Sequence, residues 1–170
     1  MQDLCSLFKN NFLVVGVGSP LRSDDQAGLL FCKELSKRGF DCLECEYGIE
    51  NCFNEILEKK PSTLIVVDAA LFEGGNPGNI IVAPEDSILA GSLMISTHTI
   101  PISVVINLLK SMNAVKRVYL VGIYPGTLEL GTAVSREVTR AIEDLVDNVE
   151  ECVIKANKEE QALREPAPEP

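Results

Sequence analysis

The chain carries acidic residues and its only histidine at positions where a metal ion or a hydrolytic water could bind. Asp24 and Asp25 follow the first apolar run in GVGSPLRSDD, Asp68 ends the run TLIVVD, and His98 stands in STHTIP. Carboxylate and imidazole groups from three different loops form a facial ligand set that nickel, zinc, iron or manganese would accept. Such an incomplete shell leaves coordination positions open for water or substrate, which metal-assisted hydrolysis needs. The pattern therefore predicts a hydrolytic metal site without choosing the metal.

Each of these residues also has an ordinary structural interpretation. A single histidine before a helix is often a cap or a surface group. Asp68 at a strand end can cap the turn that follows it. Asp24 and Asp25 can be acidic residues that complement a helix N-terminus. Only their joint placement at one edge of a sheet favours a functional site.

The glycine-rich segment GVGSP invites a nucleotide-binding interpretation. It supplies G-x-G after a strand, but the third glycine is missing at the expected spacing and Pro20 interrupts the segment. The chain also contains no G-K-[ST] of a phosphate-binding loop. We therefore expect Gly16 and Gly18 to permit close backbone approach to some other group.

Strand-like and helix-like segments alternate along most of the chain, and they must position these residues. The expected strands are 12–17, 41–47, 63–68, 80–82 and 117–123, and the expected helices are 26–37, 50–60, 101–112 and 132–155. This order predicts a single α/β domain with three layers, α/β/α, around a twisted, mostly parallel central sheet. Ligands of such sheets bind beyond the carboxyl ends of the strands, where the candidate residues fall.

Length and composition fit one domain at residues 1–156, followed by a flexible acidic and proline-rich tail at 157–170. The net charge of −10 argues against a nucleic-acid partner. No apolar run reaches the roughly 18 residues of a membrane span, and the N-terminus lacks a signal-peptide layout. We therefore expect a cytoplasmic protein with no membrane partner.

The six cysteines include one C-x-x-C pair, Cys42 and Cys45, in a strand-like run. Residues three apart in a strand point to opposite faces, and no second pair completes a tetrahedral zinc site. We expect reduced thiols, the usual state in a cytosol.

Four ordered motifs resemble the [NiFe]-hydrogenase maturation endopeptidases. VVGVGSPLRSDDQAG is similar to the N-terminal signature of that family, and LIVVDAA with NPG, STHTIP and VYLVGIYP follow in family order. The resemblance extends from about Phe12 to Leu145. STHTIP and the GIEN at 48–51 are closest to the branch that processes hydrogenases of the formate-hydrogenlyase type.

The resemblance implies a nickel-dependent, aspartic-type endopeptidase that removes the C-terminal extension of a hydrogenase large-subunit precursor after nickel insertion. The family's metal ligands fall on Asp25, Asp68 and His98, and the precursor itself would supply the nickel ion. Asp24 or Asp25 would accept the proton of the attacking water. The implied fold is a twisted sheet between helices, and the expected partner is the precursor, bound by a monomer.

Three departures from the family pattern concern loops beside the expected site. Ser19 replaces the usual Asn, Tyr124-Pro125 replaces a Q-P, and Glu46-Tyr47-Gly48 replaces a D-G-G in the loop expected to contact the precursor. Two other functions remain open from the sequence. One is a non-catalytic nickel-dependent chaperone or docking factor, and the other is a small-molecule hydrolase or nucleotide-binding domain.

Overall fold

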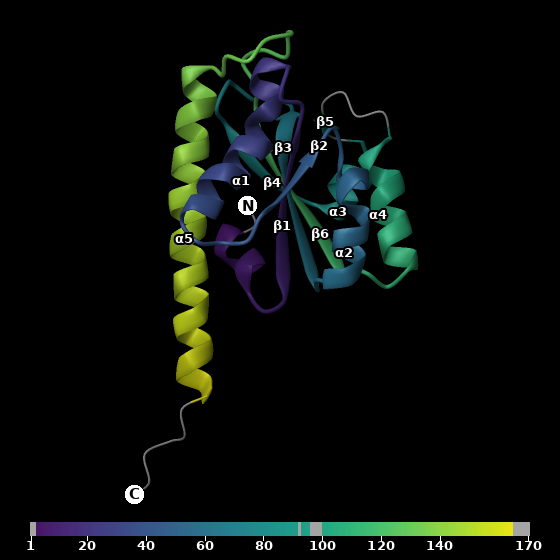
Figure 1. Cartoon of the computed structure of the whole chain (residues 1–170), viewed down its shortest axis with the longest axis vertical. Helices are drawn as coiled ribbons and strands as arrows, with labels where there is room; N and C mark the ends of the chain where they lie inside the picture. The colour runs from purple at the N-terminus through teal and green to yellow at the C-terminus, as the bar shows by residue number, and fades with distance from the viewer. Residues whose placement is uncertain (1–2, 92, 96–99, 165–170) are drawn as a thin grey trace, which may run out of the picture.

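The computed structural model describes residues 3–91, 93–95 and 100–164, and its centre is a five-stranded sheet with helices on both faces (Figure 1). The strand order is β2 (Leu43–Glu46), β1 (Phe12–Gly18), β3 (Thr63–Leu71), β6 (Arg117–Ile123) and β4 (Ile80–Pro84). Only β4 runs antiparallel to its neighbour in this order. A short strand, β5 (Met94–Ile95), pairs antiparallel with the end of β3. The predicted three-layer α/β/α fold is confirmed.

Two helical layers enclose the sheet. The 3-10 helix η1 (Leu4–Phe8), α1 (Ala27–Lys37) and α5 (Arg136–Arg164) cover one face. The other face carries the 3-10 helix η3 (Ile49–Cys52), α2 (Phe53–Lys59), α3 (Glu85–Leu89) and α4 (Ile102–Ser111).

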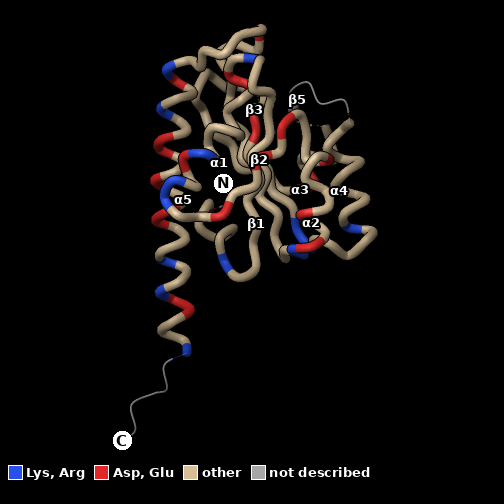
Figure 2. Tube along the Cα trace, in the orientation of Figure 1, with Lys and Arg blue, Asp and Glu red and all other residues tan. Residues whose placement is uncertain are grey.

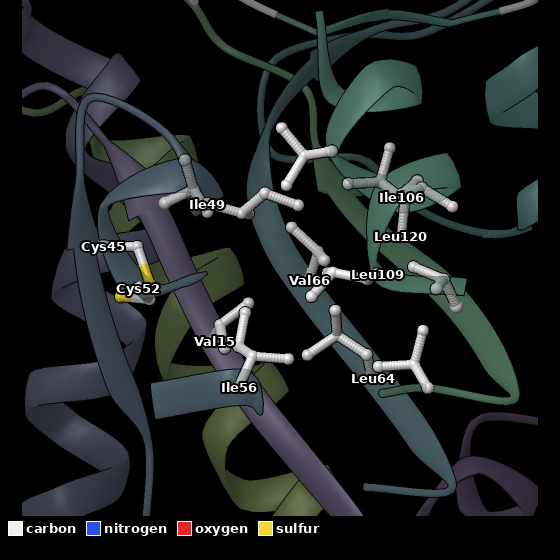
Figure 3. Packing of buried hydrophobic residues seen from close by; sticks show 14 of the residues in the cluster. Val15, Cys45, Ile49, Cys52, Ile56, Leu64, Val66, Ile106, Leu109 and Leu120 are labelled. Carbon is white, nitrogen blue, oxygen red and sulfur yellow. A yellow bond between two sulfur atoms is a disulfide. The ribbon is translucent and has the colours of Figure 1, made fainter. Parts of the chain in front are cut away.

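Strand β3 lies at the centre of both hydrophobic cores. Leu64 and Val66 point into the core beneath α2 and α4, where Ile56, Ile106 and Leu109 are buried (Figure 3). The intervening residues of β3 point into the core beneath α1 and α5, because successive strand residues face opposite sides. A strand buried on both faces reads as a continuous apolar run, as TLIVV does.

The expected elements agree with the structure apart from short or terminal segments. Strand β3 continues past Asp68 to Leu71, where β5 pairs with it. Short elements such as η1, α3 and β5 were not predicted, because they are too short to show a hydrophobic period. No helix in the described part of the chain combines the length and apolar character needed to cross a bilayer.

The last helix differs from the expectation at both ends. It was expected at 132–155 with a flexible tail from 157, whereas α5 runs from Arg136 to Arg164. Its final turns consist of strong helix formers, and Glu160 pairs with Arg164 one turn away. Acidic and basic residues both occur along this helix, as expected for a solvated surface (Figure 2). Residues 165–170 of the expected tail lie outside the described part.

The expectation of reduced thiols is wrong, because all six cysteines form disulfides. The pairs are Cys5–Cys152, Cys32–Cys42 and Cys45–Cys52. The C-x-x-C residues bond to different partners, as the strand geometry of that run requires. Cys5 in η1 meets Cys152 on α5 across a sequence separation of 147 residues.

We predict that the Cys5–Cys152 disulfide contributes strongly to stability. Replacing both residues by Ser should lower the free energy of unfolding by roughly 3–5 kcal/mol, because the bond closes a long loop in the unfolded chain. Urea unfolding without reductant measures the change. Alkylation of the denatured wild-type protein should add no group before reduction and six groups after it. Alkylation before reduction would contradict the disulfide assignment.

Candidate active site

Three glycines bring the segment after β1 down onto the ends of the strands. A Cβ atom on Gly28 would lie 2.1 Å from the carbonyl oxygen of Val67 and 2.3 Å from that of Val17. A Cβ atom on Gly16 would lie 2.0 Å from the carbonyl oxygen of Gly28. The first turn of α1 therefore packs directly on the backbones of β1 and β3. The close approach expected for the G-x-G glycines is confirmed, and the group approached is this helix.

The 3-10 helix η2 (Ser23–Gln26) joins β1 to α1 and carries both acidic residues of the first motif. A Cβ atom on Gly18 would lie 2.0 Å from the carbonyl oxygen of Asp25, so η2 sits directly over the end of β1. Asp24 and Asp25 are both buried.

Asp24 is hydrogen-bonded to the segment between β6 and α5. One carboxylate oxygen accepts from the backbone N–H of Gly126 (2.7 Å), the backbone N–H of Thr127 (3.0 Å) and the hydroxyl of Ser135 (2.8 Å). The other oxygen accepts from the backbone N–H of Ser135 (2.7 Å), just before α5. These donors compensate the burial of the charge. Asp24 thus joins the two loops that flank the site.

Asp68 lies on β3, immediately after Val67, the last β3 residue paired with β1. It is fully buried, and one carboxylate oxygen accepts from the backbone N–H of Ala69 at 2.8 Å. Asp68 shares its side of the strand with Leu64 and Val66, the side covered by α2 and α4. Because η2 contacts β3, the structure brings the segment of Asp25 and the strand of Asp68 together at one edge.

His98, the third expected ligand, lies outside the described residues. The described chain resumes at residue 100 and leads into α4 on the side of the sheet that Asp68 shares. Within residues 3–91, 93–95 and 100–164, no three His, Cys, Asp or Glu side chains are grouped to hold a metal ion. The donor chemistry of Asp25 and Asp68 fits a divalent transition metal if a further ligand joins them. The metal roles of all three residues remain predictions.

A disulfide holds the loop between β2 and α2 beside the same edge. Cys45 ends up bonded to Cys52, and between them Tyr47 takes a left-handed backbone conformation with φ of 67°. The N–H of Tyr47 donates to the carbonyl of Gly18 at 2.8 Å, which ties the loop to the end of β1. This disulfide was not predicted from the sequence, in which two cysteines that bracket a loop are its only signal.

Comparison with known proteins decides the family. A sequence model described as hydrogenase maturation protease, HycI, matches residues 48–152. The chain belongs to the hydrogenase maturation protease family. The matched segment covers more than half of the chain and includes Asp68.

Individual members of the family are similar over most of their length. The HycI protease from Thermococcus kodakarensis KOD1 is 27% identical with a TM-score of 0.74, covering 88% of this chain and 97% of that chain. The endopeptidase HycI from Escherichia coli is 27% identical with a TM-score of 0.68, covering 81% and 88%. A Methanocaldococcus jannaschii protein, provisionally named a hydrogenase maturation protease, is 28% identical over 153 residues, covering 83% of this chain and 87% of the relative.

We predict that Asp24 is needed to hold η2 against the segment between β6 and α5. Asp24→Asn should lower the free energy of unfolding by roughly 2–4 kcal/mol, because an amide nitrogen would face N–H groups that now donate to a carboxylate. Ser135→Ala removes only the hydroxyl donor and should cost about 1 kcal/mol. Denaturant unfolding of both variants is the measurement. An Asp24→Asn protein as stable as the wild type would show that these hydrogen bonds are not important.

Proposed function

We propose that this protein is an endopeptidase that removes the C-terminal extension of a [NiFe]-hydrogenase large-subunit precursor after nickel insertion. The observation that carries the proposal is the match of residues 48–152 to the hydrogenase maturation proteases. The arrangement of acidic residues supports it, because Asp25 and Asp68 approach one edge of the sheet from separate segments. Hydrolysis of a peptide bond needs such groups to bind and orient water.

We further propose that the client belongs to the formate-hydrogenlyase type. The matching family model is HycI, and the HycI proteins of T. kodakarensis and E. coli are each 27% identical to this chain. The HybD proteins of the same two organisms are 22% and 21% identical. The difference favours the branch that STHTIP and GIEN indicate.

The nickel ion belongs to the substrate in this proposal. Asp25, Asp68 and His98 would complete the coordination of nickel already inserted in the precursor, and the metal would polarise the scissile carbonyl. The donor types of these residues support the assignment. A precursor without nickel would then leave the site incomplete, which explains why cleavage would follow insertion.

Asp25 is the better candidate than Asp24 to accept the proton of the attacking water. Both oxygens of Asp24 already accept hydrogen bonds, from three backbone N–H groups and one hydroxyl. Transfer of a proton to Asp24 would place an O–H among these donors and break part of the contact between the loops. Asp24 therefore serves the contact between the loops, and we assign the proton-accepting role to Asp25, the other carboxylate of the motif.

The cavities of the structure favour a protein substrate over a small one. A cavity of about 450 Å³ lies at the amino ends of the strands, lined by Phe12, Leu35 and Phe40 among others. A second, of about 530 Å³, lies between η1 and the end of α5. Neither cavity is lined by residues of Gly16–Ser19, where a nucleotide or small-molecule pocket was the alternative. An edge made of loops suits an extended polypeptide better.

The decisive test is the intact mass of the large-subunit precursor after incubation with this protein, with and without nickel. We expect loss of a C-terminal peptide only from the nickel-loaded precursor. His98→Ala and Asp68→Asn should each slow cleavage by about 100-fold or more, because each removes a group at the reacting centre. Asp41→Asn, an exposed acid before β2 at the opposite edge, is the matched control and should cleave normally.

A stable complex with an unchanged precursor mass would contradict the proposed endopeptidase activity. It would favour the nickel-dependent chaperone instead. Cleavage that is equally fast without nickel would support the protease activity and contradict its dependence on the metal.

A further inference from the structure

We propose that Leu21 and Leu130 form a rigid apolar docking surface that grips the precursor polypeptide beside Asp25. We call these two residues the leucine pair. The inference rests on the proposed function, since it names the surface by which this protease would hold its substrate. It concerns the two loops that Asp24 joins, 19–26 and 124–135.

Both leucines of the pair are largely exposed. The exposed fraction is 58% for Leu21 and 84% for Leu130. Single exposed leucines are common on protein surfaces, but these two come from loops that lie together at the upper end of Figure 1. Arg22 and Gly131 form a parallel β-bridge. The residues just before them, Leu21 and Leu130, are therefore neighbours in register.

Hydrogen bonds hold the two loops together on either side of the pair. The N–H of Gly131 donates to the carbonyl of Leu21 (2.9 Å), and the N–H of Ser23 donates to the carbonyl of Gly131 (2.8 Å). The Arg22 guanidinium donates twice to the carbonyl of Leu128, at 3.2 and 3.3 Å. The Ser23 hydroxyl donates to the carbonyl of Glu129 at 3.0 Å, immediately before Leu130.

These bonds, with the four to Asp24, order the backbone that carries the leucine pair. Exposed loops are generally mobile, and ordering them on binding costs free energy. Here the fold has already ordered the loop backbone, so less conformational entropy is lost when a partner binds. Apolar side chains presented on a preorganised backbone are typical of a protein-binding surface.

The surface is continuous with the candidate active site. Leu21 and Asp25 lie in the same short segment, and η2 rests on the end of β1 through Gly18. A polypeptide bound to the leucine pair would therefore lie beside the segment that carries Asp25. This position suits the part of the precursor next to its C-terminal extension.

A second copy of this chain is a poorer occupant than the precursor. Two leucines per protomer cover far less than the roughly 800 Å² per partner of a stable interface. The net charge of −10 also makes two copies repel each other. We therefore assign the surface to a precursor segment that carries at least one apolar side chain.

The test measures the binding of a nickel-loaded large-subunit precursor, with its extension intact, to cleavage-impaired Asp68→Asn protein. Leu21→Ser and Leu130→Ser, each added to Asp68→Asn, should each weaken binding about tenfold, and the double change about 100-fold, from the lost burial of a leucine side chain. Leu163→Ser is the matched control. Leu163 is 86% exposed near the far end of α5 and should leave affinity unchanged (Figure 1).

In protein with Asp68 intact, the leucine changes should raise KM and leave kcat unchanged, because the pair contacts substrate away from the reacting bond. A precursor affinity unaffected by the double change would overturn the proposal, as would a lower kcat at constant KM. Loss of a dimer in the double variant, with unchanged precursor affinity, would assign the surface to a second copy. If precursor binding depends on the leucine pair but the wild-type protein does not cleave the precursor, the docking surface would be supported and the proposed endopeptidase activity would be contradicted.

Discussion

The hydrogen bonds of Asp24 are the interaction on which the rest of the site depends. They join η2 to residues 102 to 111 positions later in the chain, in the segment between β6 and α5. A buried carboxylate is tolerated only when hydrogen-bond donors surround it. The segment between β6 and α5 supplies these donors, and Asp24 in η2 supplies the acceptor. The position of Asp25 follows from this contact, because Asp25 is the next residue along the chain. The exposed leucines of both loops depend on it in the same way.

Close packing of backbone on backbone makes this contact possible. Gly16 and Gly28 let α1 approach β1 and β3 more closely than any side chain would allow, and Gly18 lets η2 settle over the end of β1. Directly below the edge, apolar side chains fill both faces of the sheet, and Figure 3 shows those beneath α2 and α4. The polar groups thus collect at one edge of a rigid domain, while the disulfide between Cys45 and Cys52 holds the neighbouring loop.

These features suit a protease of a folded precursor. The site is an edge bordered by ordered loops rather than a deep cavity, and a polypeptide end can lie across it. The acidic residues there come from separate strand ends. The proposed catalytic groups and the proposed docking surface therefore lie on the same edge of the sheet. In the proposed function the precursor supplies the nickel ion, so the free enzyme would not need a complete metal centre of its own.

The sequence by itself determined the order of strands and helices, because their periods and breaks are local properties. It also placed Asp24, Asp25 and Asp68 after apolar strands, and so at the carboxyl edge of a parallel sheet. Tertiary structure alone decided the partners of Asp24, since the donors to its carboxylate lie more than 100 residues away. It also decided the disulfides, because six cysteines allow 15 pairings and only the folded chain brings Cys5 to Cys152.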